Sequence, residues 1–128
     1  GCIIIGCSPL YVPKHMFRLG TIADINVHLD ISHIATNTLD LTLIHPDGTR
    51  VVLSSGNGGV DFTGTIFDDE AGTSISSGTA PFIGSFQPEE SLSTLDGKSV
   101  WGNWQLEIAG GSVLPGTLTG WSLEIVRE

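Results

Sequence analysis

The side chains best suited to binding a ligand in this sequence are carboxylates near its centre. The segment FDDEA (67–71) places Asp68, Asp69 and Glu70 in succession, and Asp61 lies a few residues upstream. A hard cation such as calcium takes about six to eight oxygen ligands, mostly carboxylates and carbonyls. We therefore expect calcium as a cofactor, with Asp61, Asp68, Asp69 and Glu70 as candidate ligands, although their spacing is not that of an EF-hand loop. The same residues leave an alternative open, in which Asp68 and Asp69 accept hydrogen bonds from loop backbone amides.

No catalytic constellation can be assembled from the other polar side chains. A serine nucleophile needs a histidine to accept its proton and an acid to orient that histidine, and the sequence contains no Gly-x-Ser-x-Gly turn. His28, His33 and His45 fall on strand and turn positions, where we expect solvated or hydrogen-bonded surface histidines. Zinc is not expected, because both cysteines lie far in sequence from every histidine except His15. The sequence therefore predicts no catalytic residues and no enzymatic activity of its own.

The three tryptophans are the other residues with functional potential, because an exposed indole ring can stack on a sugar or a protein surface. Trp104 and Trp121 fall on the apolar phase of alternating segments, which predicts that they pack in the core. Trp101 has no clear phase, so it is the one candidate for an exposed glycan-binding ring.

The elements that position these residues are β-strands. Apolar and polar residues alternate with a period of two in five segments, and the turn sequence HPDGT (45–49) between two of them predicts a β-hairpin. No segment has the periodicity of a long helix. The fold class we expect is all-β, a jelly-roll β-sandwich of about eight antiparallel strands. Its predicted core consists of Ile25, Val27, Leu29, Leu41, Leu43, Trp104, Leu106, Leu123 and Ile125.

The chain has the length of one domain with two long irregular stretches, residues 54–65 and 68–85, which are rich in Gly, Ser, Thr and Asp. We expect the β-sandwich over residues 19–128. Residues 1–18 are set apart as an N-terminal segment that is in part vector-derived, because His15-Met16 is typical of a cloning junction. Cys2 and Cys7 lie in that segment, and the sequence leaves open whether they form a disulfide or are free thiols.

The charge of the chain restricts its partners. Fourteen acidic residues against five Lys and Arg give a net charge of -9, which repels phosphate backbones and anionic membrane surfaces. Nucleic acid is therefore excluded as an expected partner, and no apolar run is long enough for a membrane span. An acidic surface suits calcium binding or solubility in an extracellular setting.

The order of several motifs over residues 20–126 resembles the P domain, also called P/Homo B domain, of kexin- and furin-like subtilisin-family proteases. A strand, a Pro-x-Gly-Thr turn and a second strand are followed by the acidic segment and by two Gly- and Trp-containing strands. The segments that carry the resemblance are INVHLDISH (25–33), LDLTLIHPDGT (39–49), FDDEA (67–71), PFIGSFQP (81–88), GNWQL (102–106) and GTLTGWSL (116–123).

The resemblance implies an eight-stranded jelly roll that stabilises or orients the serine protease domain of the same polypeptide, in a secreted or cell-surface protein. The form of the acidic segment resembles bacterial members of the family. Two departures from the family pattern, Asn37-Thr38 and AGG (109–111), remove acids that a calcium site there would use. The alternative from another functional class is a stand-alone extracellular binding or adhesion module, which contacts glycan or protein through the region from Asn57 to Glu70.

Overall fold

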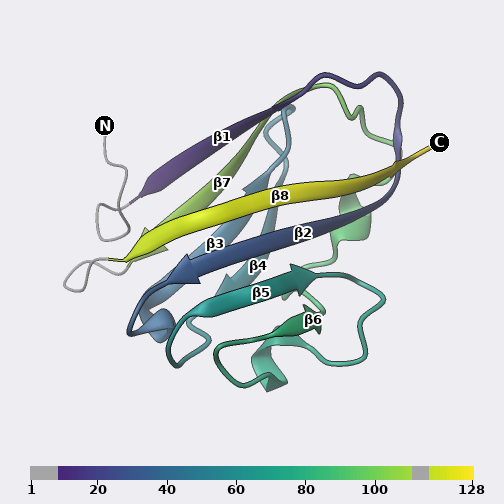
Figure 1. Ribbon diagram of the computed structural model, residues 1–128. Helices are drawn as coiled ribbons and strands as arrows, with labels where there is room; N and C mark the ends of the chain where they lie inside the picture. The colour runs from purple at the N-terminus through teal and green to yellow at the C-terminus, as the bar shows by residue number, and fades with distance from the viewer. Residues whose placement is uncertain (1–8, 111–115) are drawn as a thin grey trace.

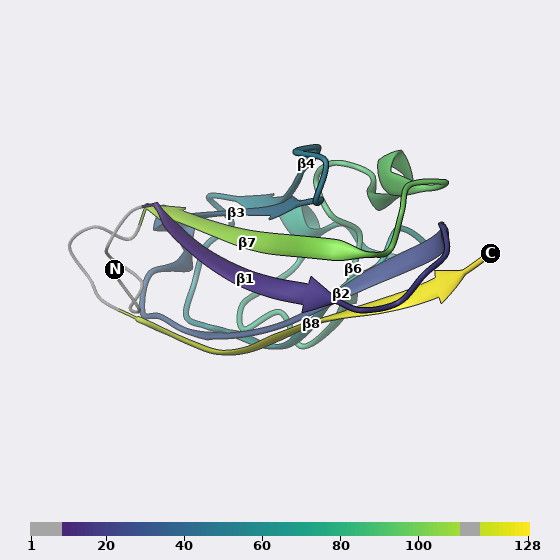
Figure 2. The ribbon, with the colours of Figure 1, turned by 90° about the horizontal axis from the view of Figure 1, so that it is seen from above.

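The computed structural model describes residues 9–110 and 116–128, which form two four-stranded β-sheets packed face to face (Figures 1 and 2). One sheet has the strand order β1-β7-β3-β4, and the other has the order β6-β5-β2-β8. The prediction of an all-β sandwich is confirmed. The strands are β1 (Leu10–Met16), β2 (Ile22–Ser32), β3 (Leu39–Ile44), β4 (Arg50–Ser55), β5 (Phe62–Phe67), β6 (Gly84–Phe86), β7 (Gly102–Gly110) and β8 (Thr117–Arg127).

Three short 3₁₀ turns complete the described elements: η1 (Thr36–Thr38), η2 (Ile75–Ser77) and η3 (Leu92–Leu95). Within residues 9–110 and 116–128, no helix has the length and apolar character needed to cross a membrane.

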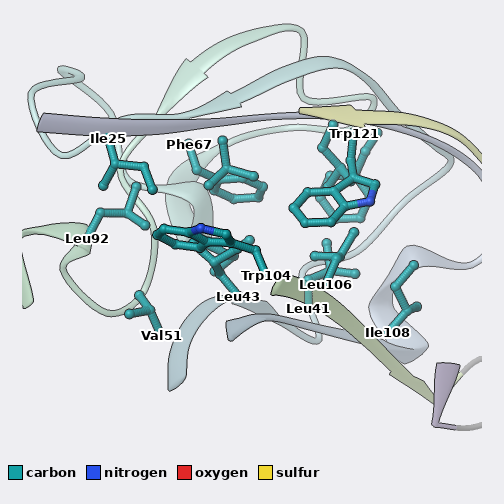
Figure 3. Close-up of a cluster of buried hydrophobic side chains, with 14 of the residues drawn as sticks. Ile25, Leu41, Leu43, Val51, Phe67, Leu92, Trp104, Leu106, Ile108 and Trp121 are labelled. Atoms are coloured by element: carbon teal, nitrogen blue, oxygen red, sulfur yellow. The ribbon is translucent and has the colours of Figure 1, made fainter. Parts of the chain in front are cut away.

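The core lies between the two sheets and follows the alternation of the sequence (Figure 3). Trp104 is completely buried, and its indole Nε1 donates a hydrogen bond of 3.0 Å to the carbonyl oxygen of Val100. Seven of the nine predicted core residues are buried, but Leu123 and Ile125 are only partly buried. Both lie on β8, an edge strand, where no neighbouring strand of the same sheet covers their outer side.

The hairpin predicted around residues 45–49 is formed by β3 and β4, which pair from Ile44 with Arg50 to Asp40 with Ser55. The backbone amide of Gly48 donates to the carbonyl oxygen of His45, and the carboxylate of Asp47 accepts from the amide of Thr49. Gly48 has a φ of 92°, which glycine adopts without strain. The turn therefore forms for the local reasons that its sequence indicates.

Two strands that the sequence analysis assigned wholly or partly to irregular stretches are parts of the second sheet. β5 pairs antiparallel with β2, but a register shift and Gly64, with a φ of 54°, interrupt its alternation. β6 pairs with β5 in parallel over three residue pairs, so the expectation that all strands are antiparallel is wrong for this pair. Strands with interrupted or very short patterns give little periodic signal, because alternation must repeat to be recognised.

The boundary predicted at residue 19 is also corrected. β1 pairs with β7 along its whole length, from Leu10 with Ile108 to Met16 with Gly102. The side chain of Leu10 is buried in the core. The sandwich therefore includes residues that the sequence analysis had set apart. Cys2 and Cys7 lie outside the described residues.

Because Leu106 is fully buried and Leu123 lies at an open edge, the same substitution should have unequal effects. We expect Leu106→Ala to lower the free energy of unfolding by about 2–5 kcal/mol, since it leaves a cavity in the core. Leu123→Ala should cost less, because water already reaches part of this side chain. Chemical denaturation of both variants measures the difference, and equal losses would contradict an open edge at β8.

Candidate functional site

The four predicted calcium ligands lie at the two ends of β5. Asp61 precedes this strand and Asp68 follows it, and the strand between them has six residues. At the usual rise per residue, the two aspartates are roughly 20 Å apart. The carboxylate of Asp61 instead accepts a hydrogen bond of 2.8 Å from the backbone amide of His33. The prediction that Asp61 shares one ion with Asp68, Asp69 and Glu70 is therefore wrong.

Asp69 organises the loop before η3. Its carboxylate accepts hydrogen bonds from the backbone amides of Leu92 and Ser93, at 2.9 and 2.8 Å, and from the hydroxyl of Ser91 at 2.8 Å. These amides lie in the first turn of η3 and have no partner within it. Asp68 similarly accepts from the backbone amide of Glu70 at 2.9 Å. Asp68 and Asp69 thus act as hydrogen-bond acceptors for loop backbone amides, the alternative that the sequence left open.

Glu70 is the acidic residue whose electrostatic surroundings are unusual. The pKa of Glu70 is raised from 4.5 to about 6, chiefly by a side-chain hydrogen bond with Asp24. Desolvation and the nearby charges of Asp24, Asp68 and Asp69 also raise this pKa. Asp24 lies near the start of β2, far from Glu70 in sequence, and the sequence analysis did not single it out. Among residues 9–110 and 116–128, no group of three or more His, Cys, Asp or Glu side chains has an arrangement that could hold a metal ion.

Two of the histidines that we expected at the surface are buried. His45 is only 4% exposed, and its Nε2 lies 2.8 Å from the carbonyl oxygen of Ser99, which can only accept. Its Nδ1 accepts from the amide of Asp47 at 3.0 Å, and its ring packs edge-on against Trp104. Nδ1 also lies 3.1 Å from a carboxylate oxygen of Asp47. His45 thus fastens the β3–β4 turn to the core.

His33 is buried at the end of β2, where its Nδ1 accepts from the amide of Ala35 at 3.0 Å. Within the described part of the chain, its Nε2 has no hydrogen-bond partner. His45 lies beside Asp47, but its Nε2 contacts the backbone carbonyl of Ser99 and not a serine hydroxyl, which a triad requires. Both buried histidines stabilise turns.

Trp101 lies at the surface, in contact with two other aromatic rings. We call His15, Phe17 and Trp101 the aromatic patch. The Phe17 ring centroid lies 4.3 Å from that of His15 and 5.7 Å from that of Trp101. Phe17 is 71% exposed and Trp101 is 45% exposed, and Leu19, two residues after Phe17, is 76% exposed. The aromatic patch joins the end of β1 to the segment before β7, so no local sequence pattern indicated it.

Asn57, at the start of the contact region that the sequence analysis predicted, is held by polar contacts at the edge of β4. The amide of Asn57 donates to Glu89 at 2.7 Å and to the hydroxyl of Ser54 at 2.8 Å. Glu89 also accepts from the backbone amide and the hydroxyl of Ser55 at 2.6 Å. These polar groups satisfy one another at the edge of β4, which leaves the aromatic patch as the more distinctive surface.

The family model of the proprotein convertase P-domain matches residues 22–125. The chain belongs to this family. P domains are non-catalytic accessory domains of proteases. No curated protein matches the chain.

Two solved structures share the fold of this P domain. One is the serine protease of Aeromonas sobria in complex with the chaperone ORF2, with a TM-score of 0.62 and 20% identity. The other is the serine protease of Aeromonas sobria, with a TM-score of 0.62 and 19% identity. Each match covers 97% of this chain and 24% of the other, so the chain spans about a quarter of the length of these proteins. Each alignment omits so few residues of this chain that it must include at least part of β1.

The raised pKa of Glu70 predicts how the stability of this P domain depends on pH. A folded-state pKa of about 6, above the ordinary 4.5, means that folding favours protonated Glu70. This contribution is complete below about pH 4.5 and is lost as the pH rises through 6. Glu70→Gln, which mimics the protonated form, should therefore raise the midpoint of thermal unfolding at pH 7.5 but not at pH 4.

The comparison is made in the presence of a chelator, and Glu128→Gln at the exposed C-terminal end is the matched control. A lower midpoint for Glu70→Gln at pH 7.5 would show that the fold stabilises the charged carboxylate, contrary to this assignment.

Proposed function

We propose that this P domain is an accessory domain that stabilises or orients a subtilisin- or kexin-like serine protease domain in the same polypeptide. Membership of the P-domain family supports an accessory role, and we extend it to a secreted or cell-surface protein of bacterial origin. The observation that carries the proposal is the group of large apolar side chains exposed at one end of the sandwich.

This group consists of Phe17 and Trp101 of the aromatic patch, together with Leu19. Monomeric domains rarely expose adjacent large apolar side chains, and such surfaces commonly mark protein contacts. Burial of this surface against a second domain would remove it from water and stabilise both domains. The contact needs no catalytic group from the P domain, which acts through packing alone.

Variants of the aromatic patch test this proposal. In the polypeptide that carries both domains, Phe17→Ser and Trp101→Ser should lower the yield and thermal stability of the active protease. The exposed Ile83, which lies beside β6, provides the control Ile83→Ser. All three variants should leave the unfolding midpoint of the isolated P domain nearly unchanged, because surface substitutions have small effects. Equal protease activity and stability for all variants would contradict docking through the patch.

A second candidate function is a stand-alone binding module that contacts glycan or a protein surface. The exposed ring of Trp101 beside Phe17 favours it, since aromatic rings can stack on sugar faces. Oligosaccharide titration of the isolated domain, followed by tryptophan fluorescence, separates the two functions. A saturable change that is lost in Trp101→Ser would favour glycan binding.

Calcium binding is a further proposal, now centred on Glu70 and Asp24. The mutual repulsion that raises the pKa of Glu70 would be relieved by a divalent cation. Asp69 is the weakest candidate, because its oxygens already accept three hydrogen bonds. The described residues do not by themselves form a metal-binding cluster, so only the response to the ion supports or refutes the proposal.

If calcium binds the folded domain, excess calcium should raise the midpoint of thermal unfolding relative to a chelator. Glu70→Gln and Asp24→Asn should abolish this rise. Asp69→Asn should lower the midpoint equally with and without calcium, because it removes acceptors from the amides of η3. A midpoint of the wild-type domain that does not respond to calcium would leave these carboxylates as structural groups only.

A further inference from the structure

The side of the sandwich where β1 and β8 lie near each other contains a groove with an apolar floor. These strands are at the ends of their sheets, and they lie near each other on one side of the sandwich (Figure 2). A cavity of about 210 Å³ lies there, which we call the edge groove. Its lining residues are Met16, Arg18, Val100, Leu123, Ile125 and Arg127.

The positive charge of the chain gathers at this groove. Of the five Lys and Arg, Arg50 is paired with Glu107 and Lys98 is paired with Asp47. The other three are Lys14, Arg18 and Arg127. None of them forms an ion pair with a carboxylate in residues 9–110 and 116–128, and two of them line the groove.

The contacts of these cations leave charge available for a ligand. Lys14 Nζ lies 5.2 Å from the centroid of the Trp121 ring, and Arg127 donates one hydrogen bond of 3.0 Å to the carbonyl oxygen of Leu19. Both partners are neutral. In a chain with a net charge of -9, three cations without carboxylate partners beside an apolar groove fit an apolar ligand that carries negative charge.

The free edges of the two sheets also differ. The edge of β4 is closed by the segment that follows β6. The carboxylates of Glu89 and Glu90 accept hydrogen bonds from the backbone amides of Ser55 and Val52, respectively. The backbone amides of the same two glutamates donate to carbonyl oxygens of β4. β8 has eleven residues without proline, and within the described chain it pairs only with β2. Its outer edge can therefore accept another strand.

We propose that the edge groove binds an extended peptide segment with two apolar residues and one acidic residue at every second position, which adds as a strand to the free edge of β8. Leu123, Ile125 and Arg127 face the same side at intervals of two. The ligand strand then needs two apolar side chains and one carboxylate at the same spacing, in the order apolar-x-apolar-x-Glu or its reverse. This inference deepens the proposed function, because the segment would belong to the attached protease domain.

The test uses the 128-residue chain and synthetic peptides with the orders Ile-x-Ile-x-Glu and Glu-x-Ile-x-Ile, where x is Ser or Thr. Peptides with Lys in place of Glu, and peptides N-methylated on the edge that faces β8, are the ligand controls. We expect one of the Glu peptides to bind and to shift the backbone amide NMR signals of β8. Neither control should bind.

The protein variants separate charge from fold. Arg18→Gln combined with Arg127→Gln should weaken binding of the Glu peptide at least about tenfold, and Arg50→Gln should leave it unchanged, because Arg50 is paired with Glu107. Unfolding midpoints of all variants verify that they are folded. Higher salt should weaken binding to the wild-type domain.

Equal binding of Glu and Lys peptides, or no shift in β8 signals at about millimolar peptide, would overturn the proposal. The cations would then only protect the edge of β8 from aggregation. Because no protease is present, this result is independent of the effect of Phe17 and Trp101 variants on the two-domain polypeptide. If the peptide binds but the Phe17 and Trp101 variants leave the two-domain polypeptide unchanged, the result would support peptide binding at the edge groove. It would also refute docking through the aromatic patch.

Discussion

The burial of Trp104 between the two sheets is the interaction on which the rest of the structure depends. Its ring fills the centre of the core, and its Nε1 holds the carbonyl oxygen of Val100. The edge of His45 packs on the same ring and hydrogen-bonds to Ser99, so the β3–β4 turn and the segment before β7 are fixed together. Because this segment is fixed on its inner side, Trp101 is directed outward beside Phe17. The exposed patch is thus a consequence of how the core is packed.

The sequence predicted those parts of the fold whose signal is local and repeated. β2, β3, β7 and β8 each alternate over several residues, and the HPDGT turn has the residues that its conformation needs. β5 was not predicted as a strand because Gly64 interrupts its alternation. β6 was not predicted because it has only three residues. The buried states of His33 and His45 were missed for a related reason. Burial of a polar side chain depends on the residues that pack around it, and for His45 these include Trp104 and the carbonyl of Ser99, which are distant in sequence.

At the candidate site, too, contacts between residues close in sequence were easier to predict than contacts between distant residues. Asp68 and Asp69 accept hydrogen bonds from loop amides, which the sequence left open as the alternative to calcium binding. Grouping Asp61 with them was wrong, because β5 lies between them and separates residues that are close in sequence. The partner that raises the pKa of Glu70 is Asp24, and only the pairing of β2 with β5 brings these two carboxylates together. The aromatic patch likewise joins residues of β1 and the β7 segment, which are separated by most of the chain.

The outer edges of β4 and β8 differ in whether they can pair with another strand. At β4, the carboxylates of Glu89 and Glu90 occupy amides that another strand would otherwise use, so negative charge closes that edge. At β8, no such segment covers the backbone within the described chain, and the charged residues that line the adjacent groove, Arg18 and Arg127, are positive. The apolar side chains of Leu123 and Ile125 stay partly exposed there because no further strand of the described chain covers them. His15 of the aromatic patch and Met16 of the edge groove are successive residues of β1, so their side chains point to opposite faces of the sheet, and a partner must extend around the β1 edge to contact both.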